Sequence, residues 1–290
     1  MERMHDAPTR RARAILIAGD LPDAPGAPPP NTLAAIATIE RDLRKRFASA
    51  SIEALTVATT KHRVLCAFDR MRGIVESDDL IVVMFAGRGK EPDGWLPSQS
   101  WVLSRGELFT DIELATALLS FPPTVDTVVI SACGYGNDRL AGARPSWLRR
   151  HRMRALARGF ARRLATTWSR ARRTSTMICL SSAGAADRAA ASEQANLATE
   201  IAGAAAAGRS YAELARGLAA HAAAGYEFHL DARPRARLRD AVLATGIGRL
   251  PEHAGEPSGE PVQPAPTPDA QGHWLLPAYS DFPCNNPRSR

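Results

Sequence analysis

One cysteine and one arginine could support chemistry, because each follows a continuous apolar run and is flanked by small residues. Cys133 lies in the segment ISACGYG after the apolar run at 125–130, and Arg88 lies in FAGRG after the run at 80–85. A thiolate is a strong nucleophile, and a neighbouring positive charge lowers the pKa of a thiol. The two residues could therefore form a nucleophilic site if the fold brings their segments together.

The apolar pattern around these segments predicts an α/β fold. Buried strands are expected at 14–18, 80–85, 125–130 and 176–180 and a shorter strand at 52–57, with helices at 31–47, 61–74, 111–119, 144–168, 192–207, 210–224 and 234–244. Strands that alternate with helices predict a mostly parallel central sheet with helices on both faces. Ligands of such sheets bind at the carboxyl ends of the strands. We therefore expect both segments to be turns at one common edge, with the sulfur of Cys133 facing the guanidinium of Arg88.

The two segments resemble the active-site turns of the caspase-like cysteine peptidases, the superfamily of caspases, metacaspases and CHAT-domain proteins. In that family a Ser/Ala-Gly-His-Gly turn supplies the base, and an Ala-Cys or Ser-Cys turn on the next strand supplies the nucleophile. Here the turns are AGRG at 86–89 and SACGYG at 131–136, and the resemblance extends from about residue 13 to residue 244. It implies a caspase-like three-layer sandwich and cysteine endopeptidase chemistry, with Cys133 at the nucleophile position and Arg88 at the histidine position.

The resemblance also implies which residues surround the substrate. These are Gly87, Gly89, Ser131, Gly134, Ser182 and Asp187. Metacaspases carry acidic residues around the primary specificity pocket, whereas the matching positions here are Ser131 and residues 97–99, which offer no carboxylate to a basic side chain. The spacing of cysteines and histidines does not match a metal site, and no cofactor is expected.

Arg88 at the histidine position leaves open whether the protein is a catalyst. A guanidinium stays protonated, so Arg88 can lower the pKa of Cys133 but cannot return a proton to the leaving amine. The seven histidines fall outside both turns. One hypothesis is a caspase-like cysteine endopeptidase homologue in which Arg88 replaces the catalytic base. The alternative is an inactive pseudopeptidase that acts as a binding, scaffold or regulatory module, and the resemblance connects such bacterial domains with defence.

The basic charge of the chain is concentrated in one segment. The formal net charge is +7, and residues 139–173 contain twelve arginines and no acidic residue, so subtracting these leaves −5 for the remainder. In caspase relatives this place links the large and small subunits. The segment could be a solvated basic helix, a processing linker, or a surface for an anionic membrane, a nucleic-acid backbone or an acidic protein. The residues assigned to that surface are Arg149, Arg150, Arg152, Arg154, Arg158, Arg162 and Arg163.

These observations predict the organisation of the chain. A tail at 1–12 precedes a caspase-like domain at 13–248, which comprises a large-subunit-like part (13–138), the arginine-rich insertion (139–175) and a small-subunit-like part (176–248). Residues 249–290 are a Pro-rich segment in which 274–276 could form a last strand. With no apolar run of transmembrane length and no signal-peptide pattern, a cytoplasmic location is expected.

Overall fold

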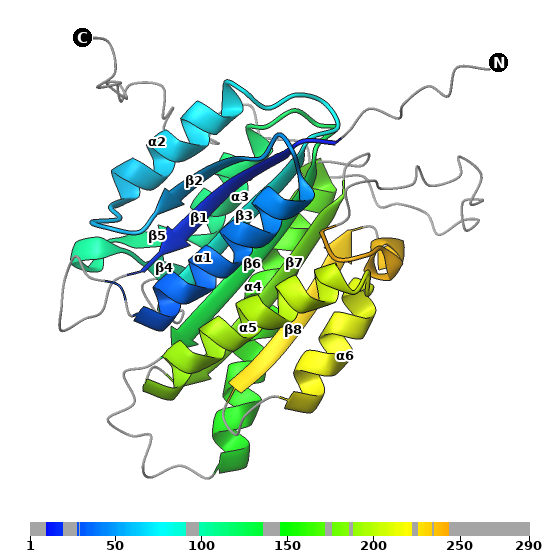
Figure 1. Ribbon diagram of the computed structural model, residues 1–290. Helices are drawn as coiled ribbons and strands as arrows, with labels where there is room; N and C mark the ends of the chain where they lie inside the picture. The colour runs from blue at the N-terminus through cyan, green and yellow to red at the C-terminus, as the bar shows by residue number, and fades with distance from the viewer. Residues whose placement is uncertain are drawn as a thin grey trace, which may run out of the picture. The chain divides into compact units, whose positions relative to one another are not determined.

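A single sheet organises the protein, as the computed structural model shows (Figure 1). The structure describes residues 10–19, 28, 30–90, 99–135, 146–171, 176–185, 188–221, 226–233 and 235–243. The strands are β1 (Ala12–Ala18), β2 (Ser51–Leu55), β3 (Leu80–Lys90), β4 (Ser100–Val102), β5 (Leu108–Thr110), β6 (Asp126–Tyr135), β7 (Met177–Ala185) and β8 (Tyr226–Arg233). The helices are α1 (Pro30–Arg46), α2 (Lys61–Arg72), α3 (Asp111–Leu119), α4 (Ser146–Ala171), α5 (Arg188–Ala206) and α6 (Tyr211–His221), with short 3₁₀ helices at Ser104–Gly106 and Arg235–Arg239.

The sheet is mostly parallel, which confirms the predicted fold class. Its strand order is β2-β1-β3-β6-β7-β8, and the first five strands are mutually parallel while β8 runs antiparallel to β7. The small strands β4 and β5 form a hairpin that pairs antiparallel with the end of β3. The chain divides into two compact units, 1–247 and 248–290, and every described residue belongs to the first.

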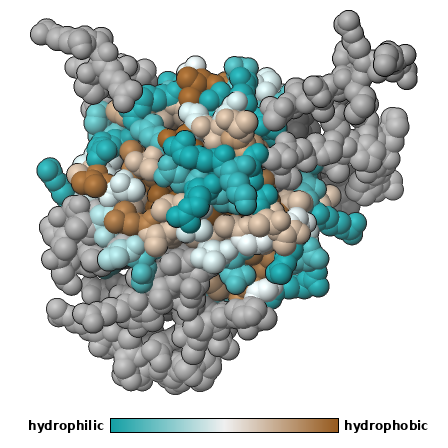
Figure 2. Space-filling model, in the orientation of Figure 1, coloured by the Kyte–Doolittle hydropathy of each residue, from teal (hydrophilic) through white to brown (hydrophobic). Residues whose placement is uncertain are grey.

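Helices cover both faces of the sheet because each buried strand alternates its side chains between two apolar cores. The core under α2, α3 and α4 contains Ile81, Val83, Phe85 and Val129 of β3 and β6. The core under α1, α5 and α6 contains Leu80, Val82, Met84, Val128 and Ile130 of the same strands. In Figure 1, α1 and α5 cross the front of the sheet. On this face Figure 2 shows apolar residues only in small separate spots among hydrophilic ones, over the part of the chain that is described.

The helix predicted in the arginine-rich segment is confirmed and is a packed element of the domain. Leu156, Phe160, Leu164 and Trp168 lie at four-residue spacing and are all buried in the core under α4. Among the described helices, none has the length and apolarity needed to cross a membrane.

The strand β8 was missed, because no element was predicted between the helices expected at 210–224 and 234–244. Of the second of these helices, the described residues form only the short 3₁₀ helix at Arg235–Arg239. The sequence of β8 alternates polar residues with Phe228, Leu230 and Ala232, a period-two pattern, and the apolar residues belong to the core under α1, α5 and α6. The strand forms here because the outer edge of β7 offers a partner for all of its length from Met177 to Gly184. The possible last strand at 274–276 lies outside the described residues.

Both predicted turns are wrong, since β3 and β6 continue through them. The two strands remain paired from Leu80↔Asp126 to Gly89↔Tyr135. On its other side, β3 approaches the residue after β1 closely: a Cβ atom on Gly87 would lie only 2.8 Å from Cα of Gly19. The segments therefore extend the sheet where an exposed bend was expected.

Candidate functional site around Cys133

The thiol of Cys133 lies inside the protein. Its residue is 0 % exposed and belongs to the core under α2, α3 and α4, together with Val129 of the same strand and Phe160 of α4. Side chains of a strand alternate between faces, so Cys133 shares the α4 face with Ser131. The expectation that its sulfur lies on an accessible rim is therefore wrong.

A hydrogen-bonded network connects Cys133 to an aromatic cover. Trp101 Nε1 donates to Ser131 Oγ at 2.9 Å, and Ser131 Oγ lies 3.2 Å from Cys133 Sγ, where either atom can donate. The Trp101 ring stacks on Phe85 with centroids 4.8 Å apart and lies 6.1 Å from the ring of Phe160. Trp101 lies on β4 of the β4–β5 hairpin. Through its contacts with Ser131, Phe85 and Phe160, it connects β6, β3 and α4. Sequence reasoning missed Trp101 because the hairpin was not predicted.

The two motif segments do lie side by side, but their key side chains leave the sheet on opposite faces. Cys133 pairs with Gly87, whereas Arg88 pairs with Gly134 on β6 and Val102 on β4. Partners across a parallel pair share a face, and neighbours along a strand do not. Arg88, which is half-buried, therefore points toward the side of α1 and α5, while Cys133 points toward α4. By this alternation, the predicted apposition of sulfur and guanidinium is not expected.

The other residues implied by the resemblance fall into three groups. Gly87, Gly89, Ser131 and Gly134 lie in the paired ends of β3 and β6. Ser182 of β7 is buried, and its Oγ donates to the carbonyl oxygen of Ser131 at 3.4 Å. Asp187 and residues 97–98 are outside the described residues.

Gln99, the last residue of the 97–99 stretch, has a structural contact. It is 1 % exposed, and its side-chain Nε2 donates to the carbonyl oxygen of Leu156 in α4 at 2.9 Å. The amide therefore helps to hold α4 against the domain.

A histidine that sequence reasoning set aside lies on the same face as Cys133. His229 of β8 pairs with Ser181 of β7, which pairs with Ser131, so three neighbouring strands present these side chains toward α4. Two strand spacings separate β8 from β6, about 10 Å, which is beyond hydrogen-bond reach of the sulfur. His229 therefore cannot act directly as the base for Cys133 in this arrangement. The period-two pattern of β8 was the signal for its position.

The surroundings of His229 favour its neutral form. Burial lowers its pKa, the positive charge of Arg158 on α4 lowers it further, and Asp231 opposes both. Burial also raises the pKa of the Cys179 thiol on β7, with a further contribution from Asp231. The environment beneath α4 therefore disfavours the charged forms of His229 and of the Cys179 thiol.

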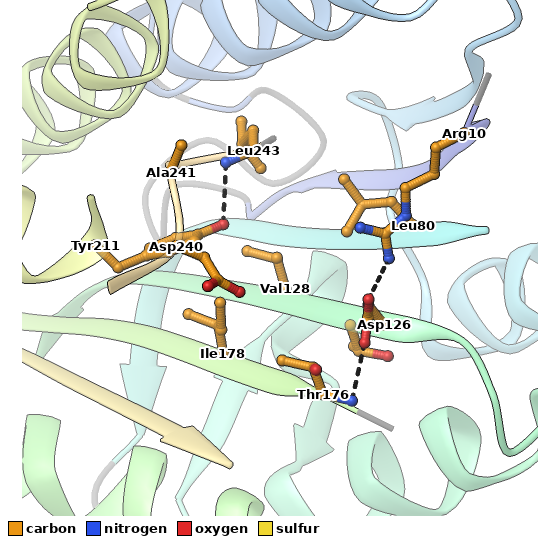
Figure 3. A pocket seen from close by; sticks show the side chains of 11 residues that line it. Arg10, Leu80, Asp126, Val128, Thr176, Ile178, Tyr211, Asp240, Ala241 and Leu243 are labelled. Atoms are coloured by element: carbon orange, nitrogen blue, oxygen red, sulfur yellow. Dashed lines mark hydrogen bonds and ion pairs between the residues drawn. The ribbon is translucent and has the colours of Figure 1, made fainter. Parts of the chain in front are cut away.

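The cavity in Figure 3 lies at the other edge of the sheet, where β3, β6 and β7 begin. Arg10 Nη2 donates to Asp126 at 2.5 Å, the other carboxylate oxygen of Asp126 accepts the amide of Thr176 at 2.9 Å, and the Tyr211 hydroxyl accepts the amide of Leu243 at 3.1 Å. Its volume of about 10 Å³ corresponds to a single water molecule. This cavity is too small for a peptide or an organic substrate.

Metal chemistry has no support in the described parts of the chain. Within them, no three histidine, cysteine, aspartate or glutamate side chains gather in a way that could hold an ion.

Comparisons with known proteins give a fold and no family. No protein-family model matches the chain, and no curated protein matches it. The chain is similar in structure to protein GSU0716 from Geobacter sulfurreducens, with a TM-score of 0.55 and 13% identity over 82% of this chain and 100% of that one. The initiator caspase Dronc of Drosophila aligns with a TM-score of 0.45 and 7% identity over 76% of this chain and 78% of that one. At these identities the first likeness indicates a shared α/β architecture.

Proposed function

We propose that this chain is a pseudopeptidase of caspase-like fold, which acts as a non-catalytic binding, scaffold or regulatory module. One observation carries the proposal: the Cys133 thiol is enclosed in the core beneath α4, and strand alternation directs Arg88 to the opposite face. The connection with bacterial defence stays an expectation from the family resemblance.

Peptide hydrolysis at this position lacks two physical requirements. A scissile carbonyl must approach the sulfur to about 3–3.5 Å, and Cys133 is enclosed in an apolar core that also contains Trp101, Phe85 and Phe160. The leaving amine also needs a proton, which a permanently charged guanidinium does not supply. His229, the histidine on the strands of this face, lies two strands away.

The decisive experiment restores the family histidine. We expect that neither the wild type nor Arg88→His cleaves a fluorescently labelled, unstructured protein substrate, because a side chain at position 88 faces away from Cys133. Cys133→Ala serves as the matched control for background hydrolysis, and circular dichroism verifies that each variant is folded. Hydrolysis by either protein that disappears in the Cys133→Ala background would overturn the proposal.

A further inference from the structure

The helix α4 carries a row of arginines at four-residue spacing. The helix contains eight arginines, one histidine and no acidic residue. Arg150, Arg154, Arg158 and Arg162 follow one another at four-residue intervals, which places each beside the next along the helix. We define these four residues as the arginine row.

Packing of α4 fixes which way Arg158 and Arg162 point. The opposite side of α4 is buried through Leu156, Phe160 and Leu164, and the Gln99 amide holds the helix at the carbonyl of Leu156. Arg158 and Arg162, the two members of the row whose side chains are described, are both exposed. Arg158 and Arg162 therefore face solvent on a helix that is packed against the domain.

Arg163 is different and provides an internal comparison. Its Nε donates to Asp111 at 2.5 Å, and this carboxylate, at the first turn of α3, is almost fully buried. Arg163, which was predicted to belong to the partner surface, thus secures α4 against α3. Within the described ranges, no acidic side chain forms such an ion pair with Arg158 or Arg162. Like charges at i and i+4 destabilise a helix by about 0.2–0.5 kcal/mol per pair, so an external anion would relieve this repulsion.

The helix is also longer than the sheet that supports it. Its 26 residues span about 39 Å, against about 33 Å for the ten residues of β6. Figure 1 shows the first turns of α4 extending past the carboxyl ends of the strands. A partner can approach this end of the helix without displacing the sheet.

The charge distribution favours a compact acidic partner. Outside residues 139–173 the chain carries a net charge of −5, which repels a polyanion long enough to extend beyond the helix. Insertion into a lipid surface would require the apolar side of α4, and that side is buried in the core. Arginine forks bind carboxylates in a bidentate manner.

We infer that the arginine row of α4 is a docking surface for an acidic polypeptide segment with carboxylates at four-residue spacing. This inference rests on the proposed function, because it names the class of partner that the non-catalytic module binds.

The test measures binding of a labelled helical peptide as long as α4, with glutamates at four-residue intervals, by fluorescence anisotropy at physiological salt. The triple variant Arg154→Gln, Arg158→Gln, Arg162→Gln is expected to weaken binding at least about tenfold, about 1.4 kcal/mol. Its matched control is Arg209→Gln, Arg216→Gln, Arg239→Gln, which removes the same charge from three exposed arginines elsewhere and should change the dissociation constant less than about twofold.

Three results would overturn the docking surface. They are equal weakening by both triple variants, no binding of the peptide, and tighter binding of a single-stranded oligonucleotide or of phosphatidylserine vesicles than of the peptide. Peptide cleavage in the same samples is monitored with Cys133→Ala as the control. Cleavage that depends on Cys133 refutes the proposed function, whereas loss of docking without cleavage refutes only the arginine row as the partner site.

Discussion

Alkylation of Cys133 in the native protein should be very slow, because we expect that Trp101, which is linked to the thiol through Ser131, is displaced before a reagent reaches the sulfur. Trp101 is 1 % exposed. Fully burying a tryptophan removes about 150–250 Å² from water, which at about 25 cal/mol per Å² is worth roughly 4–6 kcal/mol. The hydrogen bond to Ser131 adds about 1 kcal/mol. Displacing Trp101 therefore costs at least about 5 kcal/mol, and labelling should be slowed more than about 1000-fold.

The assay is iodoacetamide labelling followed by mass spectrometry of the cysteine-containing peptides, with the unfolded protein as the reference rate. Cys179, which is also 0 % exposed, is the internal control. Trp101→Ala should accelerate labelling of Cys133 by orders of magnitude and leave Cys179 protected. Trp101→Phe keeps most of the ring and loses only the N–H donor, so it should accelerate labelling by about fivefold.

One result would refute this reasoning. If Cys133 in the wild type reacts as fast as in the unfolded chain while Cys179 stays protected, the thiol is presented to solvent in the native state. The cover by Trp101 would then not describe the protein in solution, and the non-catalytic function would lose its main support.

Three further variants test the packing and electrostatics of the fold. Gly87→Ala should destabilise the protein by about 2 kcal/mol, as measured by urea unfolding, because the new Cβ would lie 2.8 Å from the backbone of Gly19. Asp79→Asn should lower the free energy of unfolding by about 2–3 kcal/mol, since this buried carboxylate accepts hydrogen bonds from two arginines and one backbone amide. His229 has a pKa below its value in the unfolded chain, so the unfolded state takes up the proton first. Its contribution to stability is complete above about pH 6.5 and is lost as the pH falls, and His229→Gln should reduce the decrease in melting temperature between about pH 7.5 and about pH 5.5.

For each of these predictions, a control or an opposing result defines the outcome that would contradict it. Gly203→Ala in α5 meets nothing within 4 Å and should not destabilise, so equal losses at both glycines would contradict the close approach of Gly87. Asp78→Asn changes an exposed neighbour of Asp79, and equal losses at these two positions would show that the buried contacts are unimportant. An unchanged pH slope in His229→Gln would show that this histidine is not desolvated.

The sequence predicted well those elements whose apolar pattern is long and local. The helix at 111–119 matches α3 residue for residue, and its Thr110 and Glu113 form a capping box that any local environment would favour. The buried strands β1, β3 and β6 were predicted from runs of apolar residues, which are required wherever helices cover both faces of a sheet. The carboxyl ends of β3 and β6 were predicted as turns, because small residues after an apolar run are equally compatible with a turn and with a close strand pair.

For the candidate site, the sequence predicted which two segments lie next to each other but not how their side chains are oriented. That the Arg88 and Cys133 segments meet follows from their places at the ends of adjacent parallel strands. Their register, however, is one residue away from apposition, and a shift of one residue moves a side chain to the other face of a sheet. The aromatic cover reaches Cys133 through a three-residue strand of the β4–β5 hairpin, too short to leave a periodic signal.

The amino-acid sequence by itself determined the class of fold, the boundaries of most helices and the presence of a strongly basic helix, because these depend on composition and on periodicity within one segment. Only the tertiary structure decided that Cys133 lies in the core and that Arg88 faces away from it. Strand register and burial are set by contacts between segments far apart in the chain, here β3 with β6 and Trp101 with Ser131, and no local pattern encodes the pairing of such partners.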